Sequence, residues 1–323
     1  MAKHVTSSTN TATNAISAGA IAKRLTRYAQ QAEGALSPNT LRAIRADTAV
    51  FTTWCVGQDM TALPASPDTV AGFIDTMAVH KKPATIRRYV ASIGHLHRAA
   101  EVADPTKANV VKLAIKRLGR QHGSRQQQAA PIGEMVVERI LATTPGKTLT
   151  EMRDIALLMT ARDMLGRRSE VVALHVHDVA FSDDGSATVL VRRSKTDTTG
   201  QGAVLWLSPR TTKALKLWLK TAAITEGPLL RSVLKGSKIG GPLDAGTVAR
   251  IYKKLASRAG VDASAISGHS ARVGMAQDLV AHGAELPEVM QAGRWKSPTM
   301  PARYAERLTA GRGAVAQYYG RRG

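Results

Sequence analysis

The segment GHSARVGMAQDLVAHGAELPEVMQAGRWKSPTMPARY, residues 268–304, carries the polar and aromatic residues that restrict the fold most. His269 and Arg272 lie three residues apart, which places both side chains on one face of a helix. Such a pair can hold a phosphate group and move a proton. Trp295 ends a Gly-Arg-Trp sequence, and Tyr304 follows it nine residues later. Each of these features also occurs by chance or as ordinary core packing, so their order along the chain decides the interpretation.

Two further candidate groups lie upstream of this segment. Arg167 and Glu170 belong to the sequence GRRSE, which follows the apolar residues 155–165. Arginines beside a buried helix favour an anion site, although ordinary placement of cations at a helix end explains them equally well. Lys195 lies in a loop, residues 194–202, between two expected strands. A single lysine in such a loop would otherwise be assigned to solvent.

The charge of the chain predicts a polyanionic partner. The chain has 45 Lys and Arg against 24 Asp and Glu, a net charge of +21. Residues 1–128 carry 17 basic and 7 acidic side chains, and residues 129–323 carry 28 and 17, so both halves are basic. An excess of this size usually indicates nucleic acid. With 13 aromatic residues in the whole chain, base stacking is not favoured, and duplex DNA fits better.

The sequence also excludes several classes of protein. Its apolar runs are too short to cross a bilayer, and the first 14 residues lack the apolar core of a secretory signal. We therefore expect a cytoplasmic protein with no membrane partner. The single cysteine, Cys55, excludes a disulfide framework. The nine histidines show no metal-ligand spacing, and we find neither a G-x-x-x-x-G-K-[ST] loop nor an acidic cluster for Mg²⁺. We expect no metal and no cofactor.

Hydrophobic periodicity predicts a mainly α fold of two domains. Residues 1–19 read as a flexible tail, and residues 20–118 as an all-helical domain. Residues 119–131 have no apolar periodicity and suit a linker. Residues 132–323 predict a mostly helical domain with a small antiparallel β-sheet. The expected strands lie near 171–179, 187–193 and 203–207, with a turn at 183–185.

The ordered set of residues resembles the tyrosine site-specific recombinases. The set runs R-x-x-E, a lysine between strands, H-x-x-R, Trp and a Tyr nine residues later. Residues 82–100, KPATIRRYVASIGHLHRAA, resemble the helix with which this family contacts DNA. The resemblance covers about residues 20–310 and implies a core-binding domain followed by a catalytic domain. It implies an enzyme that cleaves and rejoins duplex DNA as a homotetramer on two sites.

The resemblance also implies a role for each catalytic candidate. Tyr304 would attack the scissile phosphate, form a 3′-phosphotyrosyl link and release a 5′-hydroxyl. The implied assisting roles are phosphate clamps for Arg167 and Arg272, general acid for Lys195, proton transfer for His269, hydrogen bonding and packing for Trp295, and orientation of the site for Glu170.

Elementary chemistry agrees with these roles. Two forked guanidinium groups neutralise the charge that gathers on the non-bridging oxygens of the phosphate. A phenol has a pKa near 10, so it must lose its proton as it attacks. A lysine beside other cations has a lowered pKa and can protonate the leaving oxygen. The covalent intermediate conserves the bond energy, so rejoining needs no ATP.

DNA contacts outside the site are expected from two helix segments. One group starts the helix near residue 84 and comprises Lys82, Thr85, Arg87 and Arg88, and the other lies on the helix 245–258 and comprises Arg250, Lys253 and Lys254. For any one of these, an ordinary exposed helix charge is the competing interpretation. The alternatives for the whole chain are an integrase or transposon-type recombinase, a relaxing type IB topoisomerase, a non-catalytic DNA-binding protein and a helical protein with incidental charge.

Overall fold

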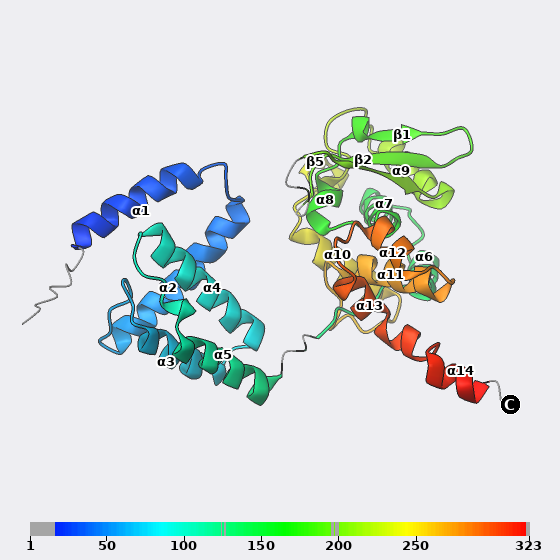
Figure 1. The fold of residues 1–323 in the computed structure, drawn as a ribbon. Coiled ribbons are helices and arrows are strands. Elements are labelled where there is room, and N and C mark those ends of the chain that lie inside the picture. Colours follow the sequence, from blue (N-terminus) through cyan, green and yellow to red (C-terminus); the bar gives the residue numbers. More distant parts are fainter. Residues whose placement is uncertain (1–16, 124, 126, 195–196, 198–199, 321–323) are drawn as a thin grey trace, which may run out of the picture. The chain divides into compact units, whose positions relative to one another are not determined.

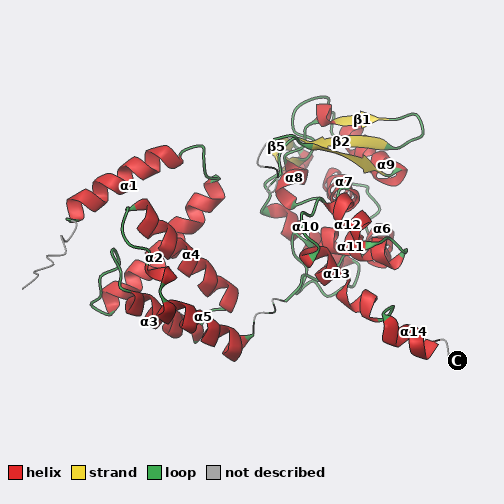
Figure 2. Cartoon of the chain, in the orientation of Figure 1, coloured by secondary structure: helices red, strands yellow, loops and turns green. Residues whose placement is uncertain are grey.

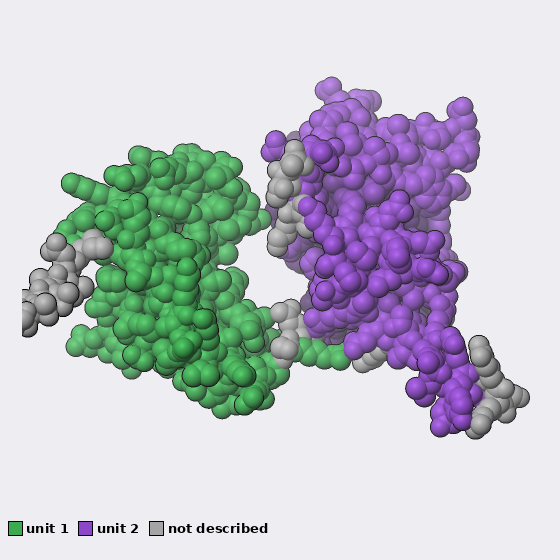
Figure 3. Space-filling view, in the orientation of Figure 1, with its two compact units in different colours: residues 1–126 green, residues 127–323 purple. Residues whose placement is uncertain are grey.

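The computed structural model describes residues 17–320, except 124, 126, 195, 196, 198 and 199. The chain divides into two compact units, residues 1–126 and 127–323 (Figure 3). Helices dominate both units, and strands occur only in the second within the described residues (Figure 2). The expected mainly α fold is therefore confirmed. Most of the expected tail lies outside the described residues, but Ala18 and Gly19 already belong to a helix that Ser17 caps.

The first unit consists of helices joined by short turns. Its elements are α1 (Ala18–Ala32), α2 (Pro38–Gly57), α3 (Pro67–Ala78), α4 (Pro83–Ala99), a 3₁₀ turn (Pro105–Lys107) and α5 (Asn109–His122). Ser37 and Ser66 cap α2 and α3, each followed by a proline in the first turn, which is a strong helix start. Phe51, Phe73 and Ile86 are fully buried between these helices.

The expected linker begins too early in the sequence. Helix α5 continues through residues 119–122 and stops where Gly123 adopts a positive φ of 68°. These four residues, Gly-Arg-Gln-His, have no apolar periodicity, but they form one more helical turn that faces solvent. Such a turn requires helical backbone angles and no buried side chain. Gly123 ends the helix in a positive-φ conformation, with ψ 174°, that essentially only glycine adopts.

The second unit surrounds α7 (Leu149–Asp163) with helices and carries two small sheets at one side (Figure 1). Its other helices are α6 (Glu134–Thr143), α8 (Arg168–Val172), α9 (Pro209–Thr221), α10 (Thr247–Arg258), α11 (Ser270–Ala281), α12 (Leu286–Gly293), α13 (Thr299–Ala310) and α14 (Ala314–Gly320), with 3₁₀ turns at Val176–Asp178 and Lys235–Ser237. Leu157 and Leu158 of α7 and Trp218 of α9 are fully buried in its core. No helix among the described residues combines the length and the apolar character needed to span a bilayer.

The first sheet is an antiparallel meander of β1 (Val179–Phe181), β2 (Ala187–Val191) and β3 (Ala203–Leu207). Leu190 pairs with Val204 across β2 and β3. The expected strand near 171–179 is wrong except at its last residue. That segment forms the short helix α8 and a 3₁₀ turn instead, because Glu170 and Asp178 accept backbone N–H groups at the starts of these turns.

A second hairpin pairs β4 (Arg231–Val233) with β5 (Ile239–Pro242). The sequence predicted a mostly helical segment here and no strand. The strand β4 is three residues long, and β5 contains two glycines and a proline, so neither shows the apolar alternation on which a strand prediction depends.

A buried arginine holds the first residues of the second unit in place. Arg162, near the end of α7, donates hydrogen bonds to the carbonyl of Ile132 and, at 2.7 Å, to Asp278 of α11. Its side chain is 4% exposed. Because removing one partner of a buried ion pair is strongly destabilising, this contact holds the residues after the linker against α11.

Gly274→Ala is expected to destabilise the second unit. A Cβ at Gly274 would lie 2.1 Å from the carbonyl oxygen of Ile132, so α11 or the adjoining segment would have to move. Overpacking of this kind costs about 1–3 kcal/mol of unfolding free energy. Gly241→Ala is the control, because a Cβ there meets nothing within 4 Å. Urea denaturation followed by circular dichroism measures both variants, and equal stability of the two would contradict the prediction.

Candidate active site

Arg167 and Glu170 meet at the start of α8. Nη1 of Arg167 lies 2.6 Å from Oε1 of Glu170, and the backbone N–H of Arg167 donates to Oε2 at 3.0 Å. The Glu170 side chain is 2% exposed and that of Arg167 is 17% exposed. Burial acts to raise the pKa of Glu170, but the charges of Arg294 and Arg167 and their hydrogen bonds hold it below its usual value. The carboxylate therefore stays ionised and orients Arg167.

Arg272 lies on α11, is 3% exposed and interacts electrostatically with both residues of this pair. Its guanidinium donates to the carbonyl of Leu165 and, at 2.7 Å, to the carbonyl of Gly293. Burial first, and then the charge of Arg167, lower the pKa of Arg272 to about 10, although the charge of Glu170 acts in the opposite direction. The group remains charged near neutral pH, so two arginines face one region of the site.

Trp295 and Tyr304 complete the cluster. The guanidinium carbon of Arg272 lies 4.0 Å from the centroid of the Trp295 ring, a cation–π contact. Trp295 packs edge-on against Tyr304, with ring centroids 5.9 Å apart. Tyr304 is half-buried on α13, and Gln277 of α11 donates to its backbone carbonyl at 2.9 Å. Burial raises the pKa of the Tyr304 phenol, and the nearby charges of Arg272, Arg167 and Arg303 act against that rise.

His269 lies at the N-cap of α11, one turn before Arg272, and is exposed. Its backbone N–H donates to the hydroxyl of Ser267 at 3.1 Å. Lys195 lies outside the described residues. The structure thus brings together Arg167, Glu170, Arg272, Trp295 and Tyr304, with His269 at the start of the same helix as Arg272.

Sequence reasoning missed one residue of this cluster, Arg294. Its Nη2 lies 2.8 Å from Oε2 of Glu170, so Glu170 binds two arginines. Arg294 is the C-cap of α12 and adopts a left-handed conformation, with φ 57° and ψ 44°. The feature of the sequence that could have indicated Arg294 is its position between Gly293 and Trp295. A Cβ at Gly293 would lie 1.8 Å from the Trp295 ring, so this turn requires glycine there and folds the indole back over the helix end.

The expected DNA-contact residues lie in both units, and two of them already bind acidic partners. Arg88 of α4 pairs with the buried Asp47 at 3.0 Å, and Lys254 of α10 pairs with the buried Asp154 at 3.1 Å. The side chains of Arg88 and Lys254 remain about half exposed. Lys82 begins α4 as its N-cap, where no side chain caps the helix.

The other expected contact residues share these two helices. They are Thr85 and Arg87 on α4, and Arg250 and Lys253 on α10. Arg250 donates to Thr247 on its own helix at 3.1 Å. A role in DNA contact stays a prediction for all seven residues.

Metal ligands are not clustered in the part of the chain that the structure describes. No group of three or more His, Cys, Asp or Glu side chains is placed there to hold a metal ion. The side chains assembled around Glu170 are instead cationic and aromatic, which suits an anionic ligand.

Glu170→Gln is expected to lower the free energy of unfolding near neutral pH by about 3 kcal/mol, because buried arginines lose their counter-charge. The pKa of Glu170 is depressed in the folded state. The stability that ionised Glu170 contributes to the fold is therefore fully present above the pKa of this carboxyl in the unfolded chain. It is lost as the pH falls through the pKa of the carboxyl in the folded protein. Urea denaturation of the wild type and the variant across this range measures the difference. A difference that stays constant as the pH falls would contradict the prediction.

Comparison with known proteins places this geometry in a family. The model of the phage integrase family matches residues 132–310. The integrase/recombinase XerD homolog of Selenomonas ruminantium is 31% identical over 284 residues, which cover 85% of this chain and 83% of that protein. The recombinase Cre of Escherichia phage P1 is 24% identical over 302 residues, 88% of each chain.

Solved structures share the fold. A lambda integrase dimer bound to a COC′ core site matches with a TM-score of 0.61 at 14% identity, covering 88% of this chain and 94% of that one. The Tn1549 transposon integrase in complex with a circular intermediate DNA also reaches 0.61, at 13% identity, covering 90% and 99%. The family model spans more than half of this chain and the XerD homolog most of it. The protein therefore belongs to the phage integrase family and is a tyrosine recombinase.

Proposed function

We propose that this recombinase cleaves and rejoins duplex DNA through a 3′-phosphotyrosyl intermediate on Tyr304, in a homotetramer that joins two target sites. The observation that carries the proposal is the cluster of Arg272, Trp295 and Tyr304, which lies close to the pair of Arg167 and Glu170. One phenol and two guanidinium groups thus belong to one partly buried cluster. Such groups are worth more there than in water, because the lower dielectric strengthens their hold on a phosphate.

In the proposed reaction the Tyr304 oxygen attacks the phosphorus while Arg167 and Arg272 neutralise the non-bridging oxygens. The bond to the 5′-oxygen breaks as the bond to tyrosine forms, so the number of phosphoester bonds is unchanged. His269 assists the loss of the phenol proton, and Lys195 donates a proton to the leaving 5′-oxygen. Glu170 and Trp295 hold the two arginines. Attack by a 5′-hydroxyl from another strand reverses these steps and completes the exchange.

The two units would divide the work of binding. We propose that the first unit, up to the end of α5 at His122, forms a core-binding domain that is joined to a catalytic domain in the second unit. DNA contacts would come from Lys82, Thr85, Arg87, Arg88, Arg250, Lys253 and Lys254. Support comes from the positive charge of both halves and from similar structures bound to DNA, including a lambda integrase tetramer bound to a Holliday junction. Because its substrate would be DNA, we propose that this bacterial or phage enzyme acts in the cytoplasm in association with the nucleoid.

A covalent capture experiment tests the proposal. The full chain is incubated with a tiled set of nicked duplexes made from the DNA around its own gene, and adducts are isolated under denaturing conditions. Sequencing of the bound DNA gives the site, and mass spectrometry identifies the peptide that carries the nucleotide. We expect the peptide that contains Tyr304. Adducts on another residue, or none on any duplex, would refute the proposed chemistry.

Plasmids with the captured site then distinguish a recombinase from a relaxing topoisomerase. A recombinase needs two sites and yields deletion or inversion products. A type IB topoisomerase relaxes a plasmid with one site and exchanges no partners. Relaxation without any two-site product would support the topoisomerase alternative.

A further inference from the structure

We propose that Arg294 is a positioning residue for cleavage. It binds one oxygen of the Glu170 carboxylate, so that Glu170 holds the side chain of Arg167 through its other oxygen only. This inference rests on the proposed function, since it concerns the reaction that Arg167 is proposed to serve. The resemblance of the sequence to the recombinases assigned no role to Arg294, which stands only as the residue before Trp295.

The hydrogen bonds of Glu170 show how the division works. Oε2 accepts from Nη2 of Arg294 at 2.8 Å and from the backbone N–H of Arg167 at 3.0 Å. Oε1 accepts from Nη1 of Arg167 at 2.6 Å. An arginine and a carboxylate alone often form two parallel hydrogen bonds. With Oε2 occupied, Arg167 is held at one nitrogen, and the rest of its guanidinium remains for a phosphate oxygen.

The conformation of Arg294 argues against a role in stability alone. Its backbone is left-handed, a conformation that disfavours side chains and that glycine usually supplies at a helix C-terminus. Its Nε and Nη1 are buried without a hydrogen-bond acceptor among the described residues. The left-handed backbone and the two buried nitrogens without acceptors both lower the stability of the fold. Buried polar groups normally have partners, and exceptions often mark functional sites.

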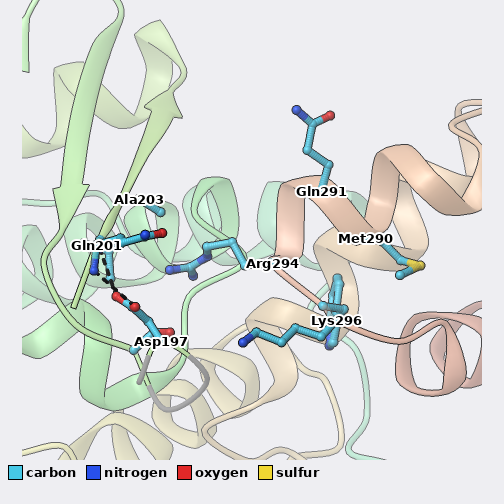
Figure 4. Close-up of a pocket in the computed structure, with 11 residues that line it drawn as sticks. Asp197, Gln201, Ala203, Met290, Gln291, Arg294 and Lys296 are labelled. Carbon is cyan, nitrogen blue, oxygen red and sulfur yellow. Dashed lines mark hydrogen bonds between the residues drawn. The ribbon is translucent and has the colours of Figure 1, made fainter. Parts of the chain in front are cut away.

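The surroundings place Arg294 at the edge of the site. It lines a cavity of about 420 Å³ together with Trp295 and Lys296. In Figure 4 its side chain extends from the end of α12 toward the segment that carries Asp197 and Gln201. Its guanidinium also donates to Glu170, so this side chain joins α12 to α8.

Three cations face Glu170 from the elements packed around it. They are Arg167 at the start of α8, Arg294 at the end of α12 and Arg272 on α11. Without Arg294, burial would weigh more heavily against the charged carboxylate, and its pKa would rise. A protonated Glu170 has lost the charge that orients Arg167. The cleavage rate should then fall at a higher pH than in the wild type.

Three variants test the inference on the duplex captured as described above. Arg294→Met removes the charge and keeps the bulk, Arg294→Lys keeps the charge, and Arg294→Gly removes the side chain but relieves the backbone. In single-turnover cleavage we expect the Met and Gly variants to be about 10- to 100-fold slower. In the pH–rate profiles of the Met and Gly variants, we expect the acid limb to lie at higher pH than in the wild type. We expect the Lys variant to keep the wild-type profile.

A double-mutant cycle and a DNA-free readout separate positioning from a structural effect. In the Glu170→Gln background, Arg294→Met should add less than about a twofold loss, since the two residues act together. The ¹³C resonance of the Glu170 carboxyl, assigned with Glu170→Gln, should titrate at higher pH in Arg294→Met.

Several outcomes would overturn the inference. They are wild-type cleavage by Arg294→Met, multiplied losses in the double mutant, an unchanged carboxyl titration, or a rate loss matched by lower thermal stability at every pH. If the wild type itself forms no adduct, the proposed function fails first and the inference falls with it.

Discussion

Tyr304→Phe is expected to abolish the covalent protein–DNA adduct while DNA binding persists. The change removes one hydroxyl oxygen and keeps the ring that packs against Trp295 at a centroid distance of 5.9 Å. The nucleophile is lost and the packing is not. The expected loss is complete to the limit of detection on a denaturing gel, and salt-dependent binding measured by gel shift should stay near the wild-type value.

Tyr318→Phe is the matched control for this substitution. Tyr318 is 52% exposed on α14 and packs against Tyr319, with ring centroids 5.1 Å apart. It is a tyrosine near the C-terminus that lies outside the spacing of nine residues after Trp295. We expect this variant to form adducts at the wild-type rate. Adducts that persist in Tyr304→Phe and disappear in Tyr318→Phe would assign the nucleophile to α14 instead.

Arg272→Lys is expected to slow cleavage by about 10²- to 10³-fold, the range found when one preorganised donor to a developing oxyanion is removed. The guanidinium fork contacts two carbonyls, those of Leu165 and Gly293, and also stacks on Trp295. A lysine ammonium has no planar fork and cannot keep these contacts together with a phosphate contact. Single-turnover cleavage of the captured duplex measures the loss.

The pH dependence gives a second readout for Arg272. Its pKa is lowered to about 10, so the Arg272 guanidinium of the wild type loses its charge only in strongly alkaline solution. Burial lowers the pKa of a lysine at the same place from a lower starting value. The alkaline limb of the rate should therefore shift to lower pH in Arg272→Lys. Arg168→Lys is the control, since Arg168 is exposed beside Arg167, and an equal loss in both variants would contradict the prediction.

Helix content and the family could be predicted from the sequence, because both depend on local patterns. Apolar spacing predicted an all-helical domain over residues 20–118, and the structure has only helices and turns in this part of the chain. The order of Arg167, His269, Arg272, Trp295 and Tyr304 indicated the family, which the family model and the XerD homolog confirm. The strand expected near 171–179 was wrong, since side-chain caps at Glu170 and Asp178 outweigh a run of apolar residues.

The contacts inside the site depend on tertiary structure. Glu170 and Arg294 are 124 residues apart, and Arg272 and Leu165 are 107 apart, so no local pattern reports their contact. The left-handed backbone of Arg294 follows from how Trp295 folds back over Gly293. The sequence by itself determined which residue types are present and in what order. Only packing of α8, α11, α12 and α13 decided which charges share the buried carboxylate, because desolvation and hydrogen bonding act over a few ångströms of space.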